Sequence, residues 1–172
     1  MSTTTATVLR WASAASASAF SDVVCVALGT GVGAGVVIGG KLYCGRDTGA
    51  GEIGSIPYLD RDYEYYCSSR FFVGRGTTGK EAYERAAAGD PEALALWREF
   101  GGHVGQLVML VLYTYDPEAI VFGGSIAHAF GFFREAMYEQ LKRFPYAKTV
   151  EGLHICCSNI DHVGLLGASA CE

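Results

Sequence analysis

The sequence predicts an α/β fold in which a mixed sheet is flanked by helices. Two observations lead to this prediction. Short apolar, β-branched runs alternate along the chain with longer segments whose apolar residues recur at helical spacing, and this alternation is typical of layered α/β domains. The chain has 172 residues, half of them hydrophobic, which suffices for a substantial core and favours one domain.

The first predicted strands surround a glycine-dense segment. Residues 23–28 (VVCVAL) and 36–38 (VVI) are apolar and β-branched, residues 28–35 (LGTGVGAG) join them, and a two-glycine turn leads to a third strand at 41–43. Because glycine has no Cβ, such a loop presents backbone N–H groups and a threonine hydroxyl to an anion. No Lys-Ser/Thr pair and no helix follows it, which excludes a P-loop and a dinucleotide fingerprint. A plain turn between strands is the alternative.

The sequence predicts three helices in the middle of the chain. Residues 63–73 form an aromatic-rich helix, and residues 78–88 form a second one, with Thr77 or Thr78 as its cap. The third is long: it starts at Asp90-Pro91, a cap followed by proline at the first helical position, and ends at Asp116-Pro117. Its buried face is predicted to carry Leu94, Trp97, Phe100, Val104, Leu107, Val108 and Val111.

The last part of the chain contains a second glycine turn. Residues 119–122 form a short buried strand that runs into Gly123-Gly124, and a helix over 129–143, a strand at 153–157 and a helix near 163–170 follow. In α/β proteins ligands bind at the carboxyl ends of strands, and a helix N-terminus there favours an anion. A plain strand-to-helix turn would also use two glycines. Two such loops in one domain favour a nucleotide more than either does alone.

Charge, cysteines and hydropathy exclude several functions. The formal net charge of −5 argues against nucleic-acid binding through bulk electrostatics. The six cysteines show neither C-x-x-C spacing nor a disulfide rhythm, so we expect reduced, buried thiols and a cytoplasmic protein. No apolar run approaches the roughly 18 residues that cross a membrane, so no membrane partner is expected.

Residues 1–20 form a separate region rich in Ser, Thr and Ala, with Arg10 as its one charged residue. This composition resembles an organellar transit peptide. A single arginine is weak support for that interpretation, and a small-residue helix packed on the domain or a frayed leader is the better one. We therefore expect a leader or packed helix over 1–20 and the main domain over 21–172.

Four segments together resemble one known family. They are LGTGVGAG at 28–35, AGEIG at 50–54, DPEAIVFGG at 116–124 and LGA at 166–168, and their order and spacing are similar to those of the ROK family (repressors, open reading frames and kinases) over residues 21–170. Because this family includes bacterial glucokinases, the resemblance implies the carboxy-terminal lobe of an actin-like, ribonuclease H-like sugar kinase. The reaction it implies is transfer of the γ-phosphoryl group of ATP, with Mg²⁺, to the 6-hydroxyl of glucose or a related hexose.

The resemblance also assigns roles to residues. It places Gly29, Thr30, Gly31 and Gly33 in the second phosphate motif, Gly123 and Gly124 in the adenosine motif, and Glu52 and Glu64 on the sugar hydroxyls. Ionised carboxylates accept hydrogen bonds from vicinal hydroxyls, and neighbouring aromatic residues give a sugar ring an apolar face. Without the resemblance, Glu52 is a loop charge and Glu64 is a glutamate favoured by the start of a helix.

Two departures from the family pattern concern the sugar and a metal. Ser55 stands where the family has a histidine after E-x-G, and it offers the sugar one hydroxyl instead. The family's C-x-C-x(4)-C cluster is absent, and Cys67 is the one thiol nearby. A four-ligand zinc site has no ligands here, so we expect no structural zinc.

A third departure concerns catalysis. The family's first phosphate loop, D-x-G-x-T, has a partial counterpart only at Asp47, where Gly51 occupies the threonine position. The asparagine and catalytic aspartate of the family align near Ser2 and Thr3, and the chain's one asparagine is Asn159. A general base must reach the hydroxyl that it deprotonates, so we expect this lobe to bind its ligands but to turn over little by itself.

Two functions of other classes stay open. Because ROK relatives include repressors, the chain can be a sugar-sensing module, although it offers neither a helix-turn-helix nor a basic patch. Because ROK kinases pair through this lobe, it can serve assembly, and a homodimer is expected.

Overall fold

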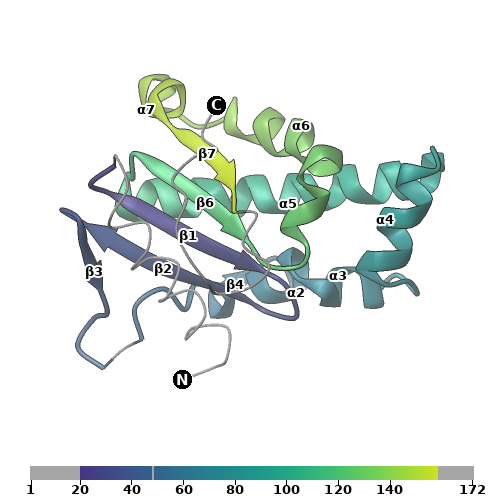
Figure 1. The fold of residues 1–172 in the computed structure, drawn as a ribbon, viewed down its shortest axis with the longest axis horizontal. Coiled ribbons are helices and arrows are strands. Elements are labelled where there is room, and N and C mark those ends of the chain that lie inside the picture. Colours follow the sequence, from purple (N-terminus) through teal and green to yellow (C-terminus); the bar gives the residue numbers. More distant parts are fainter. Residues whose placement is uncertain (1–19, 48, 159–172) are drawn as a thin grey trace.

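The computed structural model describes residues 20–47 and 49–158, which form a five-stranded sheet with helices packed against it (Figure 1). The strands lie in the order β3-β2-β1-β6-β7. Their bounds are β1 Val23–Leu28, β2 Val32–Ile38, β3 Lys41–Tyr43, β6 Ala119–Gly123 and β7 His154–Cys157. The pairs β1–β2 and β2–β3 are antiparallel, whereas β1–β6 and β6–β7 are parallel. The predicted mixed sheet is confirmed.

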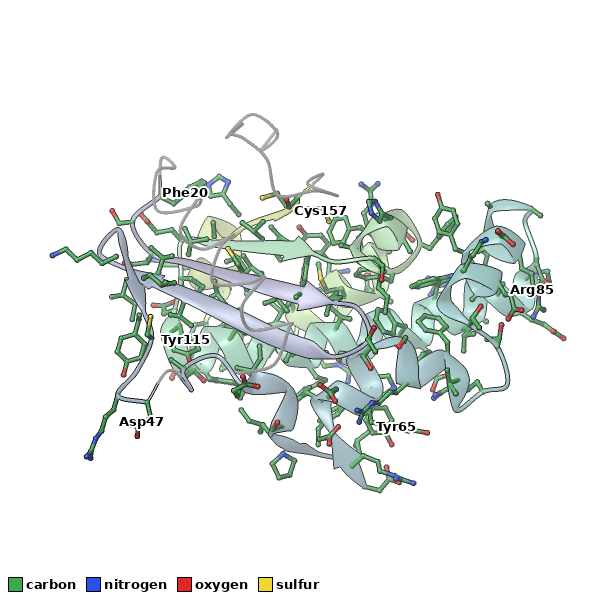
Figure 2. All side chains as sticks on the ribbon, turned by 60° about the horizontal axis from the view of Figure 1, so that its bottom comes forward. Phe20, Asp47, Tyr65, Arg85, Tyr115 and Cys157 are labelled. Atoms are coloured by element: carbon green, nitrogen blue, oxygen red, sulfur yellow. The ribbon has the colours of Figure 1, made fainter. Side chains whose placement is uncertain are left out.

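The helices between and after these strands include one very long one. The set comprises α2 Tyr63–Cys67, α3 Ser69–Val73, α4 Gly79–Ala87, α5 Pro91–Tyr115, α6 Phe130–Leu141 and α7 Ala147–Gly152, with the 3-10 helices η1 Ile53–Ser55 and η2 Ala127–Ala129 and a small hairpin of β4 Pro57–Tyr58 and β5 Arg61–Asp62. The 25 residues of α5 extend about 37 Å at 1.5 Å per residue. In Figure 2, Tyr115 at its end and Arg85 of α4 accordingly lie at opposite ends of the molecule.

The sheet buries both of its faces. Val24 and Val26 of β1 belong to the main core, together with Phe100 of α5 and Phe133 of α6. Cys25 points to the other face and belongs to a smaller cluster. Burial raises the pKa of the Cys25 thiol to about 12, so this cysteine is an inert core residue, as the sequence predicts.

The glycine-dense segment after β1 is shorter as a loop than the sequence predicts. Strand β2 already begins at Val32, so the turn consists of Gly29, Thr30 and Gly31. Gly33 lies inside β2, where it is buried and pairs with Ala27 of β1. The prediction of a loop up to residue 35 was wrong because residues 32–38 contribute a full row of ladder hydrogen bonds even where the side chain is only a hydrogen atom.

The predicted helix over 63–73 is divided into α2 and α3. Ser68 between them has an extended backbone (φ −127°, ψ −174°), and its hydroxyl accepts a hydrogen bond from the N–H of Arg70 at 3.2 Å. Serine competes for backbone hydrogen bonds in this way at helix starts. The break turns α3 toward the glycine turn after β1.

Near the end of the described chain the elements differ modestly from expectation. The helix predicted over 129–143 is present as η2 followed by α6, and the strand predicted at 153–157 is β7. Helix α7 and the β4–β5 hairpin were not predicted. The leader or packed helix expected over 1–20, except for Phe20, and the helix expected near 163–170 lie outside the described residues.

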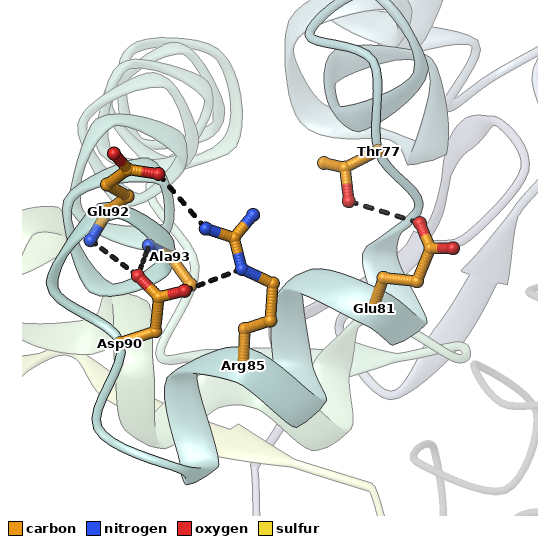
Figure 3. A network of polar contacts seen from close by, with 6 residues as sticks. All are labelled: Thr77, Glu81, Arg85, Asp90, Glu92 and Ala93. Atoms are coloured by element: carbon orange, nitrogen blue, oxygen red, sulfur yellow. Dashed lines mark hydrogen bonds and ion pairs between the residues drawn. The ribbon is translucent and has the colours of Figure 1, made fainter.

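Helices α4 and α5 are joined by a polar network at their adjoining ends (Figure 3). The carboxylate of Asp90 caps α5 by accepting from the N–H groups of Glu92 and Ala93, and it also accepts from Arg85 Nε of α4 at 2.6 Å. Arg85 Nη2 donates to Glu92 at 3.1 Å. Thr78 and Glu81 form the capping box predicted for α4. These contacts orient α4, which lines a cavity described below.

Two glycines of α5 allow α6 to approach closely. A Cβ atom on Gly101 would overlap the carbonyl oxygen of Phe133, and one on Gly105 would lie 2.6 Å from the Cβ of Gln140. A Cβ on the neighbouring Gly102 would meet nothing closer than 3.7 Å. Only the glycines that face α6 are therefore required for this packing.

We predict that Gly101→Ala lowers the free energy of unfolding by about 1–3 kcal/mol, because α6 has to move away. The matched control is Gly102→Ala, which should be neutral or stabilising by up to about 1 kcal/mol, since alanine is the better helix former. Urea denaturation followed by circular dichroism measures both variants. Equal effects of the two substitutions would contradict the packing argument.

Candidate functional site

The two predicted glycine turns lie side by side at one edge of the sheet. Strands β1 and β6 are parallel and register Ala27 opposite Gly123, so both turns leave the sheet at its carboxyl end. Gly124 has φ +91°, and a Cβ atom there would overlap the carbonyl oxygen of Leu28. That same oxygen accepts a hydrogen bond from the N–H of Ile126 at 3.0 Å. Glycine is thus required at Gly124 for both its conformation and its contact.

Glu64 brings a carboxylate against the Gly29–Gly31 turn. It lies at the start of helix α2, which Asp62 caps by accepting from the N–H of Tyr65 at 2.7 Å. Glu64 Oε2 accepts from the N–H of Val32 at 3.3 Å, and a Cβ on Gly31 would lie only 2.5 Å from this oxygen. Two residues that the sequence assigns to different ligands, Glu64 and Gly31, are therefore in contact.

The segment that carries Glu52 and Ser55 packs against the beginning of strand β2, where Val32 lies. Gly51 has φ +92° and its carbonyl accepts from the N–H of Ala34 at 2.7 Å. A Cβ atom on Gly54 would overlap the carbonyl oxygen of Val32. Glu52 and Ser55 are exposed on this segment. Val32 thus contacts Glu64 through its N–H and the η1 segment through its carbonyl, which brings the three predicted sugar residues to one region.

A cavity of about 300 Å³ adjoins the turns. Residues of α3, α4, α5 and the segment after β6 line it: Ser69, Gly79, Lys80, Tyr83, Trp97, Ser125, Ile126, His128 and Ala129. Two contacts join it to the first turn: the N–H of Ser69 donates to the carbonyl of Gly29 at 2.8 Å, and a Cβ on Gly29 would lie 3.8 Å from Ser125 Oγ. The indole Nε1 of Trp97 is buried and has no hydrogen-bond partner among the described residues. The cavity therefore combines an aromatic wall, a cation and several hydroxyl groups.

Sequence reasoning missed most of this cavity. Trp97 is recognisable as a buried residue from its helical spacing, and it is indeed 1% exposed. Lys80 and Tyr83 look like ordinary surface residues of a short amphipathic helix. Only the position of α4, which the ion pairs of Arg85 fix, turns them toward the residues after β6.

A larger hollow of about 600 Å³ lies between α4 and α5. Its two arginines are already in ion pairs: Arg85 with Glu92 of the same lining and with Asp90, and Arg75 with Glu99. Each pair also serves to cap or join helices. We therefore place the candidate site at the smaller cavity and the two turns.

Aromatic residues hold the β4–β5 hairpin where the family pattern has its cysteine cluster. The ring of Tyr58 stacks on Tyr63 at 4.3 Å between centroids, and its hydroxyl lies 3.2 Å from Nδ1 of His103 in α5. The ring of Tyr66 lies 4.6 Å from that of His103. Burial raises the pKa of the Cys67 thiol, whereas zinc requires a thiolate. Among residues 20–47 and 49–158 no group of three or more His, Cys, Asp or Glu residues is arranged to hold a metal ion.

Comparisons with known proteins identify the family and the fold of this chain. A family model described as the ROK family matches residues 3–171. The N-acetylmannosamine kinase of Escherichia coli O127:H6 is 30% identical over 168 residues, which cover 87% of this chain and 56% of that kinase. The glucokinase of Streptomyces coelicolor is 28% identical over 140 residues, which cover 62% of this chain and 44% of that enzyme.

Solved structures share the fold. A ROK family glucokinase from Streptomyces griseus in complex with glucose and AMPPNP has a TM-score of 0.70 at 24% identity, and the likeness covers 80% of this chain and 56% of that one. A ROK family transcriptional regulator, a homologue of the E. coli MLC protein, has a TM-score of 0.78 at 20% identity, covering 87% and 46%. Kinases and a regulator are thus both similar to this chain in architecture.

The chain belongs to the ROK family, as its motifs predict. It spans about half the length of the relatives that it matches. None of its described helices combines the length and the apolar character that a membrane span requires.

The partly buried contact between Tyr58 and His103 leads to a prediction on pH. Burial lowers the pKa of His103, although Glu99 opposes the shift, so the folded protein favours the neutral ring. The neutral ring therefore contributes fully to the free energy of unfolding above the pKa of the unfolded histidine, about 6.5. This contribution is lost as the pH falls below that value. We expect the melting temperature to drop between pH 7.5 and 5.5, and His103→Gln to make this drop smaller.

The control for this prediction is His154→Gln, which removes an exposed histidine on β7. This variant should keep the pH dependence of the unaltered chain. Carboxylates with lowered pKa values, such as those of Asp90 and Glu81, lose their contribution to folding stability only at more acidic pH. They therefore do not affect the comparison between pH 7.5 and 5.5. Identical pH profiles for both variants would show that the ring of His103 is not the titrating group.

Proposed function

We propose that this chain forms the carboxy-terminal lobe of an ATP:hexose 6-phosphotransferase of the ROK family, and that it binds both the nucleotide and the sugar. The observation that carries the proposal is the contact of Glu64 with the Gly29–Gly31 turn, directly beside the Gly123-Gly124 turn. A carboxylate suited to sugar hydroxyls and a backbone turn suited to phosphate are then adjacent, as transfer of a phosphoryl group requires.

In this proposal the nucleotide base occupies the 300 Å³ cavity. Trp97 and Tyr83 give it an apolar wall, and Lys80 lies in the same lining. The phosphates then extend over the turn of Gly29, Thr30 and Gly31, whose two glycines carry no Cβ. The N–H of Gly29 donates to the carbonyl of Gly31 at 3.1 Å, so the N–H groups of Thr30 and Gly31 are the ones proposed to bind phosphate. The contact between Ser69 and Gly29 supports this path because it joins a residue that lines the cavity to the turn.

The hexose is proposed to bind on the other side of the turn. Glu52 and Glu64 accept hydrogen bonds from its hydroxyls, and Ser55 offers one hydroxyl where the family has a histidine. The names of the relatives support glucose or an N-acetylated hexose such as N-acetylmannosamine as the substrate.

Mg²⁺ enters the proposal with the nucleotide. Magnesium keeps several waters and is typically held by substrate phosphates and one or two carboxylates, so it needs no dedicated protein cage. No zinc is proposed. The hairpin that carries Tyr58 is supported by aromatic packing, as described above.

A regulatory or assembly role is the alternative from another class. Its support is the regulator of the same fold, with a TM-score of 0.78. The two functions differ in what they bind: a kinase lobe takes both nucleotide and sugar, a sensor takes sugar alone, and an assembly fragment takes neither. We further propose that the chain is cytoplasmic, forms a homodimer and has no nucleic-acid partner. Size-exclusion chromatography with light scattering tests the homodimer.

Glu64 gives the first test of the proposed function. Isothermal titration calorimetry of the 172-residue chain with glucose, N-acetylmannosamine and ATP, each alone, should give binding of ATP and of at least one hexose. Glu64→Gln should weaken the hexose by about ten- to hundredfold, because a hydrogen bond to a charged group is replaced by a neutral one. The matched control is Glu139→Gln, which alters an exposed carboxylate paired with Lys142 on α6. Hexose binding unaffected by Glu64→Gln would contradict the sugar site.

The second test concerns turnover. A coupled assay with ATP, Mg²⁺ and glucose should give little or no hexose phosphate from the 172-residue chain, because none of its described carboxylates is placed by the family pattern as the general base. Turnover comparable to that of an intact bacterial glucokinase would overturn this part of the proposal. It would leave the two binding sites to be assigned by the calorimetry.

A further inference from the structure

Arg70 forms an ion pair with the proposed sugar carboxylate. Its Nη2 lies 3.0 Å from Glu64 Oε1, while Glu64 Oε2 is the oxygen that accepts from Val32 beside Gly31. We propose that Arg70 is a phosphate-binding residue: it neutralises Glu64 at the glycine turn and offers its remaining donors to the terminal phosphates of the nucleotide. This inference rests on the proposed function and adds a residue that the sequence motifs do not include.

The backbone of α3 places Arg70 at the turn. The buried hydroxyl of Ser68 accepts from the N–H of Arg70, and the N–H of Ser69 donates to the carbonyl of Gly29 at 2.8 Å. The residue that precedes Arg70 is therefore bonded to the proposed phosphate turn. The break between α2 and α3 is what brings this backbone within reach.

Electrostatics explains why a cation is needed here. Glu64 puts a negative charge in contact with Gly31, and a polyphosphate over the same turn would be repelled by it. At an effective dielectric constant of about 20, two unit charges 4 Å apart interact by several RT. Arg70 is the cation that the structure pairs with Glu64, and Lys80 lies farther along, in the cavity lining.

The exposure of Arg70 leaves it free to bind a ligand. Its side chain is 58% exposed, against 29% for Glu64. A guanidinium carries five N–H donors in a planar fork, so pairing with one carboxylate oxygen leaves most of them available. An exposed ion pair contributes little to stability, which makes a purely structural role a weak explanation of this contact.

The experiment compares ATP with adenosine, which has the base but no phosphates. Arg70→Met keeps the length of the side chain and removes its charge. We expect it to weaken ATP by about fivefold or more at low salt while adenosine changes by less than about twofold. Arg70→Lys restores the charge and should recover most of the ATP affinity. Calorimetry at one fixed Mg²⁺ concentration measures all titrations.

A double variant separates charge from structure. If Arg70 counteracts Glu64, then Glu64→Gln in the Arg70→Met background should strengthen ATP binding again, because the repelling carboxylate has been removed. The control for net charge is Arg61→Met, an equally exposed arginine on the β4–β5 hairpin, which should leave ATP affinity unchanged. Melting temperatures of all variants establish that each is folded.

Three results would overturn the inference. If ATP binding is the same in Arg70→Met as in the unaltered chain, Arg70 does not bind phosphate, although the proposed function stands. If ATP and adenosine weaken equally, Arg70 acts on the base cavity and not on the phosphates. If the unaltered chain binds neither ATP nor adenosine, the proposed nucleotide site fails and the inference fails with it.

Discussion

The parallel pairing of β1 with β6 determines where every candidate ligand contact lies. These two strands are far apart in the sequence, and between them the chain forms all the helices from α2 to α5. Because Ala27 registers with Gly123, the turns that follow both strands leave the sheet at the same edge. A shift of one residue would rotate the two strands' side chains to opposite faces and separate the core from the helices that cover it. The register therefore places the cavity, the first turn and Glu64 within one region.

Close backbone contacts then determine which residues can occupy this edge. The first turn is bounded on one side by the carboxylate of Glu64, which approaches Gly31, and on the other by Gly124, which approaches the carbonyl of Leu28. Side chains at these two glycines would displace a carboxylate or a backbone oxygen. The missing Cβ atoms that suit a turn to phosphate are thus used first for packing within the protein. This is why glycine alone is a weak sign of ligand binding and why the neighbouring charges have to be considered with it.

The sequence predicts the fold well wherever local patterns are strong. The apolar run before residue 29, the Asp90-Pro91 start of α5 and the strand before Gly123 are all present where spacing and capping chemistry indicate. The extent of the glycine turn was not predictable in the same way, because Gly33 has no side chain whose alternation would reveal a strand. The break at Ser68 and the positions of Lys80 and Arg70 depend on contacts between α3, α4 and residues distant in the chain. Such contacts leave no periodic signal, so only the three-dimensional arrangement identifies these residues.

The charge of the molecule is consistent with a site whose electrostatics are local. A chain with a net charge of −5 repels a polyphosphate at long range, and salt screens that repulsion beyond a Debye length of about 8 Å. In the proposed function, binding is therefore decided by the arrangement within a few ångströms of the turn. There, the proposed function needs Glu64 near the phosphates so that it can hold the sugar, although its negative charge repels them. The inferred role of Arg70 resolves this conflict: its guanidinium contacts the carboxylate from α3, and a planar cation with several donors can serve a carboxylate and a phosphate at once.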